Sequence, residues 1–291
     1  MEGLGISIDG RDISLDICVH RAVIDLALSD FADSATLVFQ DAEQRWGDWA
    51  PEAGLPIALS WGDQKLFEGL IDNAAASNGF FSLEVSSAAA RKPFRFSHTC
   101  RGTLRDALTA IADALGLAPK FTGDFSASIK GVWLEEMTAG EMLRALRRFF
   151  LFDFIADPER IRFISQDAER ELSPAFRWAE GPNGDFGFSA PPAPHGCAVT
   201  NGAATETAGD GADRVIAFGF PSACLAAIAQ ARTAEAARAR AALKINADTI
   251  WIPGAAADIG SITEDFRGAW LIRSTRIDVA VWTQSVKLAK L

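Results

Sequence analysis

The stretch from Ala22 to Ile71 constrains the fold most, because its apolar residues alternate with polar ones and its runs are short. Ala35, Leu37 and Phe39 would lie on one face of a strand, while the residues between them lie on the other. The turn formers that separate the runs are Asp41, Pro51, Gly54, Pro56 and the pair Gly62-Asp63. The pattern predicts an antiparallel meander, with further strands over 57–61 and 66–71.

The rest of the N-terminal region continues this pattern. Residues 5–8 and 13–17 are predicted to form a hairpin around Asp9-Gly10, and 18–28 to continue in extended form. A last strand over 80–85 follows the turn at Asn78-Gly79. Residues 1–88 are therefore predicted to form a small antiparallel barrel or sandwich, an arrangement that hides most strand edges.

A change of pattern at Ala88 predicts a second unit over 89–167. Thr103 and Thr138 are each candidate N-caps, with an acidic residue three positions later and an apolar helical face behind them. The first helix would end near Gly116 and the second near Phe150, with a hairpin over 152–164 turning at Asp157-Pro158. Arg144, Arg147 and Arg148 form the polar side of the second helix. We interpret them as a solvated face or a subunit salt-bridge set in preference to a nucleic-acid patch.

Residues 168–291 predict a third unit, again built mainly of strands. Its first part is rich in Pro, Gly and Ala, and the run Pro-Pro-Ala-Pro is interpreted as a stiff turn between strands. The residues around Asp210 resemble a calcium loop but do not meet its register. An Ala-rich helix is predicted over 233–244, with Thr233 as its N-cap. The predicted strands of this unit are 214–220, 248–252, 260–263, 270–279 and 281–289.

Composition limits the function classes. The chain has 291 residues, of which 49% are hydrophobic, which is enough for a sizeable core and about two domains. A formal net charge of −10 argues against a general nucleic-acid coat, since binding phosphates requires a basic surface. No apolar run reaches the length of a membrane span, and the N-terminus has neither a basic nor an apolar segment. We therefore expect no membrane insertion and no signal peptide.

The cysteines and histidines do not form a metal motif. Cys18, Cys100, Cys197 and Cys224 are widely spaced, and no C-x-x-C is present, so reduced and buried thiols are expected. A dyad of His98 and Cys100 stays open as an alternative, although a polar residue at a strand end beside a core thiol is the preferred interpretation.

Taken together, the fragments resemble the phage late-control protein D family, whose members are baseplate or tail hub proteins related to the hub part of VgrG. The N-terminal residues that carry the resemblance are Phe31-Ala32-Asp33, Asp41, Trp46, Gly54, Trp61-Gly62, Phe67-Glu68-Gly69 and Asp72. The later ones are Thr103 to Leu117, Trp133 to Ile164, Glu235-Ala236 to Leu243, Pro253-Gly254 and Gly268 to Ile272. The chain departs from the family where Phe150-Leu151-Phe152 replaces a helix-ending Tyr-Gly, where Glu135 or Glu136 replaces a Gln, and where a frequent late His is absent.

The resemblance implies an α+β, mainly β fold with two tail-tube-like antiparallel barrels and a helix-helix-hairpin module between them. It further implies a homotrimer forming a pseudo-hexameric ring in a virion, assembled in the host cytoplasm. Its partners would be a tail tube or distal tail protein and a spike protein, with a tape-measure protein as a further candidate and DNA passing through the lumen. Ring closure would bury apolar residues such as Trp46 and Trp49.

Two function classes remain, a structural hub and a tail-associated cell-wall hydrolase. The motifs H-E-x-x-H and G-x-S-x-G are missing from the sequence, so we expect no catalytic residue, no metal and no cofactor. The excess of acid, 38 Asp and Glu against 28 Lys and Arg, favours a lumen that repels phosphate. Asp41, Asp63 and Asp72 are candidates for exposed acids at its rim, and plain solvated turn residues stay open as the alternative.

Overall fold

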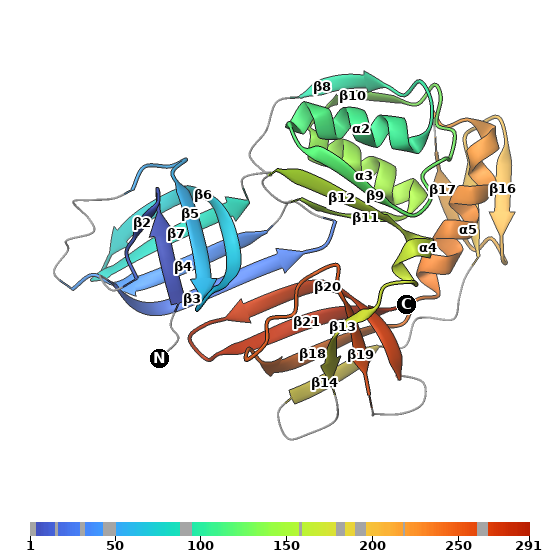
Figure 1. The fold of residues 1–291 in the computed structure, drawn as a ribbon. Helices are drawn as coiled ribbons and strands as arrows, with labels where there is room; N and C mark the ends of the chain where they lie inside the picture. Colours follow the sequence, from blue (N-terminus) through green and yellow to red (C-terminus); the bar gives the residue numbers. More distant parts are fainter. Residues whose placement is uncertain are drawn as a thin grey trace.

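A computed structural model of the chain contains three regions that share contacts (Figure 1). The structure describes residues 4–14, 17–29, 33–42, 51–87, 95–156, 159–178, 184–189, 196–217, 219–260 and 267–291, with the backbone alone described for 184–189. Trp46, Trp49, the Pro-Pro-Ala-Pro run and the Asp157-Pro158 turn lie outside these residues. Strands predominate, and the predicted α+β, mainly β class is confirmed.

The N-terminal region is a curled antiparallel sheet. Its strands are β1 (Leu4–Ile8), β2 (Arg11–Asp12), β3 (Cys18–Ala27), β4 (Ser34–Gln40), β5 (Pro56–Trp61), β6 (Gln64–Ser77) and β7 (Phe80–Ser87). A register shift between Ile71 and Asn73 lets β6 pair with β5 over its first half and with β7 over its second. Ala35, Leu37 and Phe39 are buried in the core that this curl encloses, as the alternation predicted.

The first hairpin is shorter than predicted. Its second strand covers only Arg11–Asp12, and residues 13, 14 and 17 of the predicted strand 13–17 are not in a strand, while 15–16 lie outside the described residues. Asp12 Oδ1 accepts a hydrogen bond from the Ser14 backbone N–H at 2.9 Å, which turns the chain out of the ladder. Ser14 Oγ then accepts the Ile6 N–H at 2.8 Å in place of a backbone carbonyl.

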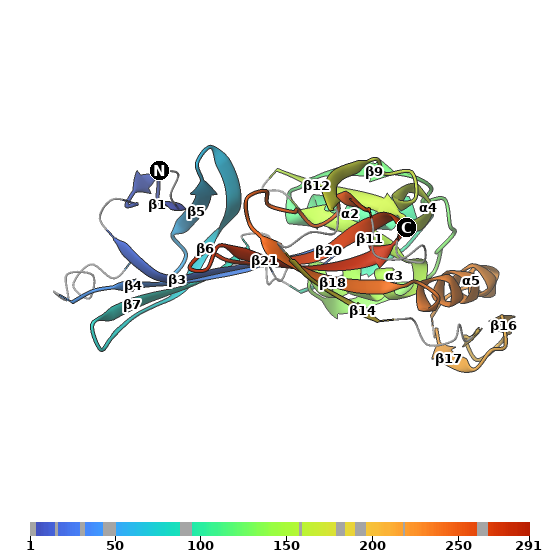
Figure 2. The same ribbon diagram turned by 90° about the horizontal axis from the view of Figure 1, so that it is seen from below.

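The C-terminal strands continue the same sheet. They are β13 (Pro174–Trp178), β14 (Gly184–Ser189), β18 (Arg240–Asn246), β19 (Ala256–Ile259), β20 (Gly268–Asp278) and β21 (Thr283–Lys290). Strand β20 pairs antiparallel with β3, and this joins the N-terminal and C-terminal strands into one 13-stranded sheet. Figure 2 shows β4, β3, β21 and β18 following one another along a single layer. A second core, which includes Trp270 and Trp251, lies on the C-terminal strands.

The predicted helix over 233–244 is wrong. Helix α5 covers Leu225–Ala236, and the residues from Arg240 onward form β18. Thr233 is not an N-cap, because its hydroxyl donates to the Ala229 carbonyl at 2.9 Å inside the helix. Ala241 and Leu243 are buried between β14 and β21 at strand spacing, so burial in the sheet overrides the helix propensity of an Ala-rich segment.

Two other C-terminal strand predictions need correction. Residues 248–252 are not a strand, because the Gln284 side chain satisfies this backbone in place of a ladder. It accepts the Trp251 N–H at 2.9 Å and donates to the Thr249 carbonyl at 2.5 Å. The strand predicted over 214–220 is β17 (Asp213–Ile216), which ends earlier. Most of the strand predicted over 260–263 lies outside the described residues.

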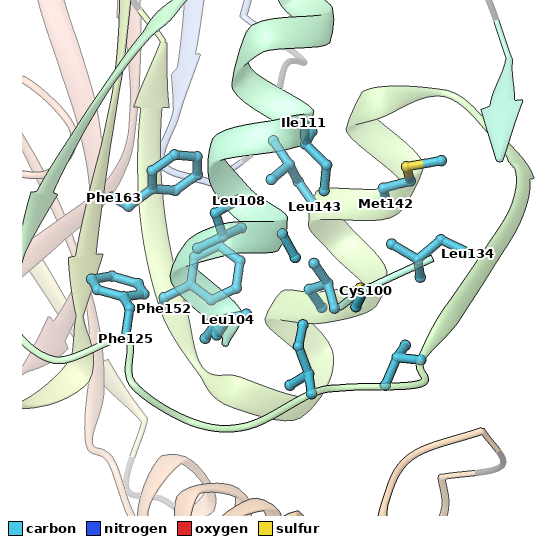
Figure 3. Packing of buried hydrophobic residues seen from close by; sticks show 14 of the residues in the cluster. Cys100, Leu104, Leu108, Ile111, Phe125, Leu134, Met142, Leu143, Phe152 and Phe163 are labelled. Atoms are coloured by element: carbon cyan, nitrogen blue, oxygen red, sulfur yellow. The ribbon is translucent and has the colours of Figure 1, made fainter. Parts of the chain in front are cut away.

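The central module packs two helices against a small mixed sheet. It contains β8 (Phe96–Thr99), α2 (Leu104–Leu115), β9 (Ala118–Thr122), β10 (Trp133–Met137), α3 (Ala139–Phe150), β11 (Phe152–Ala156), β12 (Arg160–Ser165) and α4 (Gln166–Glu169). Both predicted caps are confirmed as reciprocal capping boxes, Thr103 with Asp106 and Thr138 with Glu141. Figure 3 shows the apolar faces of the helices meeting Phe125, Phe152 and Phe163 in one core.

A further segment packs on this module. It consists of β15 (Cys197–Thr200), β16 (Thr205–Ala208), β17, the 3-10 turn η2 (Ser222–Cys224) and α5. Its buried residues Cys197, Leu225 and Ile228 belong to the module's core cluster. Figure 1 shows α5 beside the module, next to β16 and β17.

Candidate functional site

His98 and Cys100 lie in different surroundings, which shift their pKa values in opposite directions. Cys100 points into the module core (Figure 3), and burial raises the pKa of its thiol to about 11. His98 lies in strand β8, where burial and the nearby Arg101 lower its pKa. A thiol held protonated by apolar surroundings is not an activated nucleophile, so this pair offers no cysteine chemistry.

A pocket of about 470 Å³ lies beside His98. It is lined by Ser97, His98, Thr99, Arg101, Asp106 and Ala107. Its carboxylate is committed to structure, because Asp106 accepts the Thr103 N–H at 2.7 Å and this contact lowers the pKa of Asp106. The Thr103 hydroxyl donates to the same carboxylate oxygen at 2.9 Å. Among the described residues that line the pocket, therefore, no carboxylate is free to act as a base.

Metal sites receive no support in the described part of the chain. No group of three or more His, Cys, Asp or Glu residues there is arranged to hold a metal ion. Asp210, in the calcium-like segment, caps the backbone instead: its Oδ1 accepts the N–H groups of Gly196 and Ala212, the latter at 3.1 Å. None of the described helices is long and apolar enough to cross a membrane.

The three acids predicted at the rim of the lumen differ in their exposure to solvent. Asp41 is only 5% exposed and its backbone N–H donates to the Gly79 carbonyl at 2.7 Å, so its prediction as an exposed acid is wrong. Asp63 and Asp72 are exposed, and Asp72 accepts a hydrogen bond from the Ser86 hydroxyl at 3.1 Å.

The arginines of α3 also differ in their contacts. Arg148 lies over the ring of Phe149, with the guanidinium carbon 5.9 Å from the ring centroid. Arg147 turns inward and forms an ion pair with Asp153 at 2.8 Å. Because Arg147 is committed to this partner, the helix does not present the three arginines as one phosphate-binding patch.

Asp153 is the centre of a buried charge cluster that the sequence analysis did not find. Its Oδ1 accepts from Arg147 and from the Ser29 hydroxyl, and its Oδ2 accepts from Arg273. Ser29 also bonds the β11 backbone in both directions, accepting the Phe154 N–H at 3.0 Å and donating its own N–H to the Phe154 carbonyl at 2.9 Å. One carboxylate thus joins residues from the N-terminal region, helix α3, strand β11 and strand β20.

Glu169 extends the cluster to the last turn of α5. Its Oε2 accepts from Arg238 at 2.8 Å, and Arg238 in turn contacts Glu235 at 3.3 Å. Glu235 lies 3.7 Å from Arg273, which closes the set of charges. The side chains of Asp153 and Glu169 are each only 2% exposed. We name these residues the junction cluster: Ser29, Arg147, Asp153, Glu169, Glu235, Arg238 and Arg273.

The two buried carboxyl groups are driven to opposite ionisation states. Burial alone would raise the pKa of Asp153, but the hydrogen bond from Glu169 and the charges of Arg273 and Arg147 hold it well below its usual range. Burial, together with the contact to Asp153, raises the pKa of Glu169 to about 8 despite Arg238. Arg273 keeps its charge, because its acidic neighbours outweigh its burial and raise its pKa.

Around the β3–β20 junction the sheet also presents a polar face, opposite the two cores that lie on it, which we name the free polar face. One transverse row of cross-strand pairs runs through Lys244, Ser285, Arg276, Asp25, Ser34 and Ser86. Every residue of this row is exposed or half-buried. The row carries charges of both signs, with Arg276 directly beside Asp25, and its other members include three serines. This face therefore offers a water-facing wall that spans both halves of the molecule.

Comparison with known proteins identifies the fold. No protein-family model matches the chain, and no curated protein matches it in sequence. A tail protein from Neisseria meningitidis MC58 aligns with a TM-score of 0.74 and 13% identity, over 99% of this chain and 96% of that one. The 43 kDa tail protein of prophage MuSo2 from Shewanella oneidensis aligns with a TM-score of 0.71 and 12% identity, over 100% and 97%.

A component of the Escherichia coli type VI secretion system, itself similar to the phage T4 tail proteins gp27 and gp5, aligns with a TM-score of 0.61. The identity is 14%, over 98% of this chain and 76% of that one. The likeness extends across all three regions and the connections between them. The chain therefore has the fold of phage tail proteins.

Proposed function

We propose that this protein is a structural hub of a phage tail or a phage-like injection particle, of the late-control protein D type. The observation that carries the proposal is the likeness in fold to tail proteins over essentially the whole chain. The similarity to a type VI secretion component supports a place at the end of a tube, since that protein resembles gp27 and gp5. The role requires shape and assembly and needs no reaction.

The proposed assembly is a homotrimer in which each chain contributes two tube-like units to a pseudo-hexameric ring. The pairing of β3 with β20 supports it, because that pairing holds N-terminal and C-terminal strands in one layer. We propose that the free polar face lines the channel. Its small hydroxyl side chains and mixed charges would let DNA pass without the salt-dependent grip of a basic wall.

The remaining parts of the proposal follow from this place in the particle. The tail tube or a distal tail protein would bind one side of the ring and a spike protein the other, with a tape-measure protein as a further partner. The protein would be a virion component assembled in the host cytoplasm. The units 1–88, 89–167 and 168–291 stay as proposed domains. A tail-associated hydrolase is the alternative, but no observation of the described residues favours it.

The oligomeric state tests the proposal. Native mass spectrometry of the purified chain is expected to give a trimer, and electron-microscope class averages an annulus with pseudo-sixfold features. A variant with Ser285→Lys on the free face is the control: it should assemble equally well, because a wall residue makes no contact between subunits. A stable monomer at all concentrations, or a ring of six chains, would contradict the proposal.

A further inference from the structure

The junction cluster contains two carboxyl groups that face each other out of contact with solvent. Glu169 and Asp153 line the same small cavity, and the side chain of each is only 2% exposed. Two ionised carboxylates have only acceptors and repel each other, so a buried pair is stabilised when one of the two carries a proton. The shared burial of the two carboxyl groups therefore favours a bound proton at this place.

The partners decide which residue holds the proton. Asp153 is surrounded by donors, because Ser29, Arg147 and Arg273 all bond its two oxygens. Glu169 has one close cation, Arg238, and shares it with Glu235. Asp153 is thus the better anion, and Glu169 is the residue left to donate.

The surroundings leave no means to solvate a second negative charge. The cavity beside the pair has a volume of about 10 Å³, at the lower limit for a single water molecule. The charged groups of the described residues that face the pair are Arg147 on α3, Arg273 on β20, and Glu235 and Arg238 at the end of α5. Ionisation of Glu169 would place a second negative charge beside that of Asp153, without water to screen the repulsion between them.

We propose that Asp153 and Glu169 form a proton-binding site, and that the shared proton supports the Asp153–Arg273 pair, which attaches strand β11 of the module to strand β20. Loss of the proton loosens this attachment, so the contact between the module and the 13-stranded sheet depends on pH. The device is independent of the hub role and would operate in any particle that contains this chain.

The sign of the pH dependence follows from linkage. The pKa of Glu169 is about 8 in the folded protein and near 4.5 in the unfolded chain, so the folded state binds the extra proton between these values. Stability from this group is complete below pH 4.5 and is lost as the pH rises toward 8. The unfolding equilibrium constant is expected to rise by at most about 1,000-fold over that interval.

The test combines Glu169→Gln with urea unfolding from pH 4.5 to 8.5. Glutamine keeps a donor toward Asp153 and cannot ionise, so the variant should lose this pH-dependent part of its stability and exceed the wild type at pH 8. Glu84→Gln, at an exposed position on β7, is the matched control and should keep the wild-type slope. Equal slopes for the wild type and Glu169→Gln would overturn the proposal.

Two further measurements locate the effect. The carboxyl ¹³C resonance of Glu169 in the wild-type protein should titrate far above the ordinary range of glutamate, and a midpoint near 4.5 would refute a bound proton even if the variant did not fold. Hydrogen exchange at pH 8.5 should be faster in the wild type than in Glu169→Gln at 152–156 and 166–169, with no difference in β4 and β7. A difference spread evenly over the chain would argue against a local lock.

Discussion

The chain is held together across two junctions that use similar charges in different surroundings. Where β3 meets β20, Arg276 lies 3.3 Å from Asp25 across the strand pair, and both side chains are about half exposed. Where the module meets the sheet, Arg273 on the same strand bonds Asp153, whose side chain is almost fully buried. The first pair can exchange its partner for water, whereas the second cannot. Burial, more than the contact distance, decides what each pair contributes.

At the β3–β20 junction, backbone pairing stabilises the contact more than the exposed ion pair does. At the β3–β20 junction, five successive residues pair in register, from Ser274 with Ala27 to Asp278 with Val23. Ile277 and Ile24 stand opposite each other beneath this ladder, and both are fully buried. At the module junction β11 does not pair with β20 in the described part of the chain, so the attachment depends mainly on side chains, together with the backbone bond from Ser29 to Phe154. Different kinds of substitution should therefore destabilise the two junctions.

The largest effect is expected from Asp153→Asn. The substitution keeps the size of the side chain but leaves Arg147 and Arg273 without their carboxylate, and breaking such a buried set costs about 3–5 kcal/mol. Urea unfolding at pH 6 measures it. The double variant with Arg273→Met should lose less than the two single losses combined, because one stranded charge is removed with its partner. Strict additivity would show that the two residues do not act together.

A smaller loss is expected at the other junction from Ile277→Ala. Removing this buried side chain opens a cavity between β20 and β3, at a cost of about 2–4 kcal/mol. Thermal and urea unfolding both report it. Val281→Ala, on the same hairpin but exposed, is the control and should change stability by less than about 0.5 kcal/mol. A loss at Ile277 no greater than the control's would mean that the strand junction does not depend on its apolar layer.

The sequence predicts some elements well because local signals agree with the fold. Helices α2 and α3 each combine a reciprocal cap with an apolar face, and both were located to within a residue or two. The segment Arg240 to Lys244 shows the opposite case. Alanines favour a helix there, while the alternation of buried Ala241 and Leu243 suits a strand. Only the presence of β14 and β21 on either side decides between them.

The junction cluster could not have been predicted from local patterns. Asp153 meets Arg273 across 120 residues and Ser29 across 124, and Glu169 meets Arg238 across 69. Each residue by itself is typical of a solvated surface. One signal did exist: Asp153 lies between Phe152 and Phe154 in an apolar strand, where a carboxylate needs a buried partner. The sequence gives no means of choosing that partner among 28 Lys and Arg residues.

The smallest effect is expected from Asp25→Asn, and it provides the sharpest test of the comparison. The substitution removes the same charge as Asp153→Asn from a pair with the same chemistry, on the strand that pairs with β20. Because both partners are exposed, water replaces the lost contact, and the expected change is at most about 0.5 kcal/mol, smaller still at 1 M salt. Urea unfolding of the two variants side by side measures the difference. If Asp25→Asn cost as much as Asp153→Asn, desolvation would not be what separates the two junctions, and the role assigned here to the β3–β20 backbone ladder would be wrong.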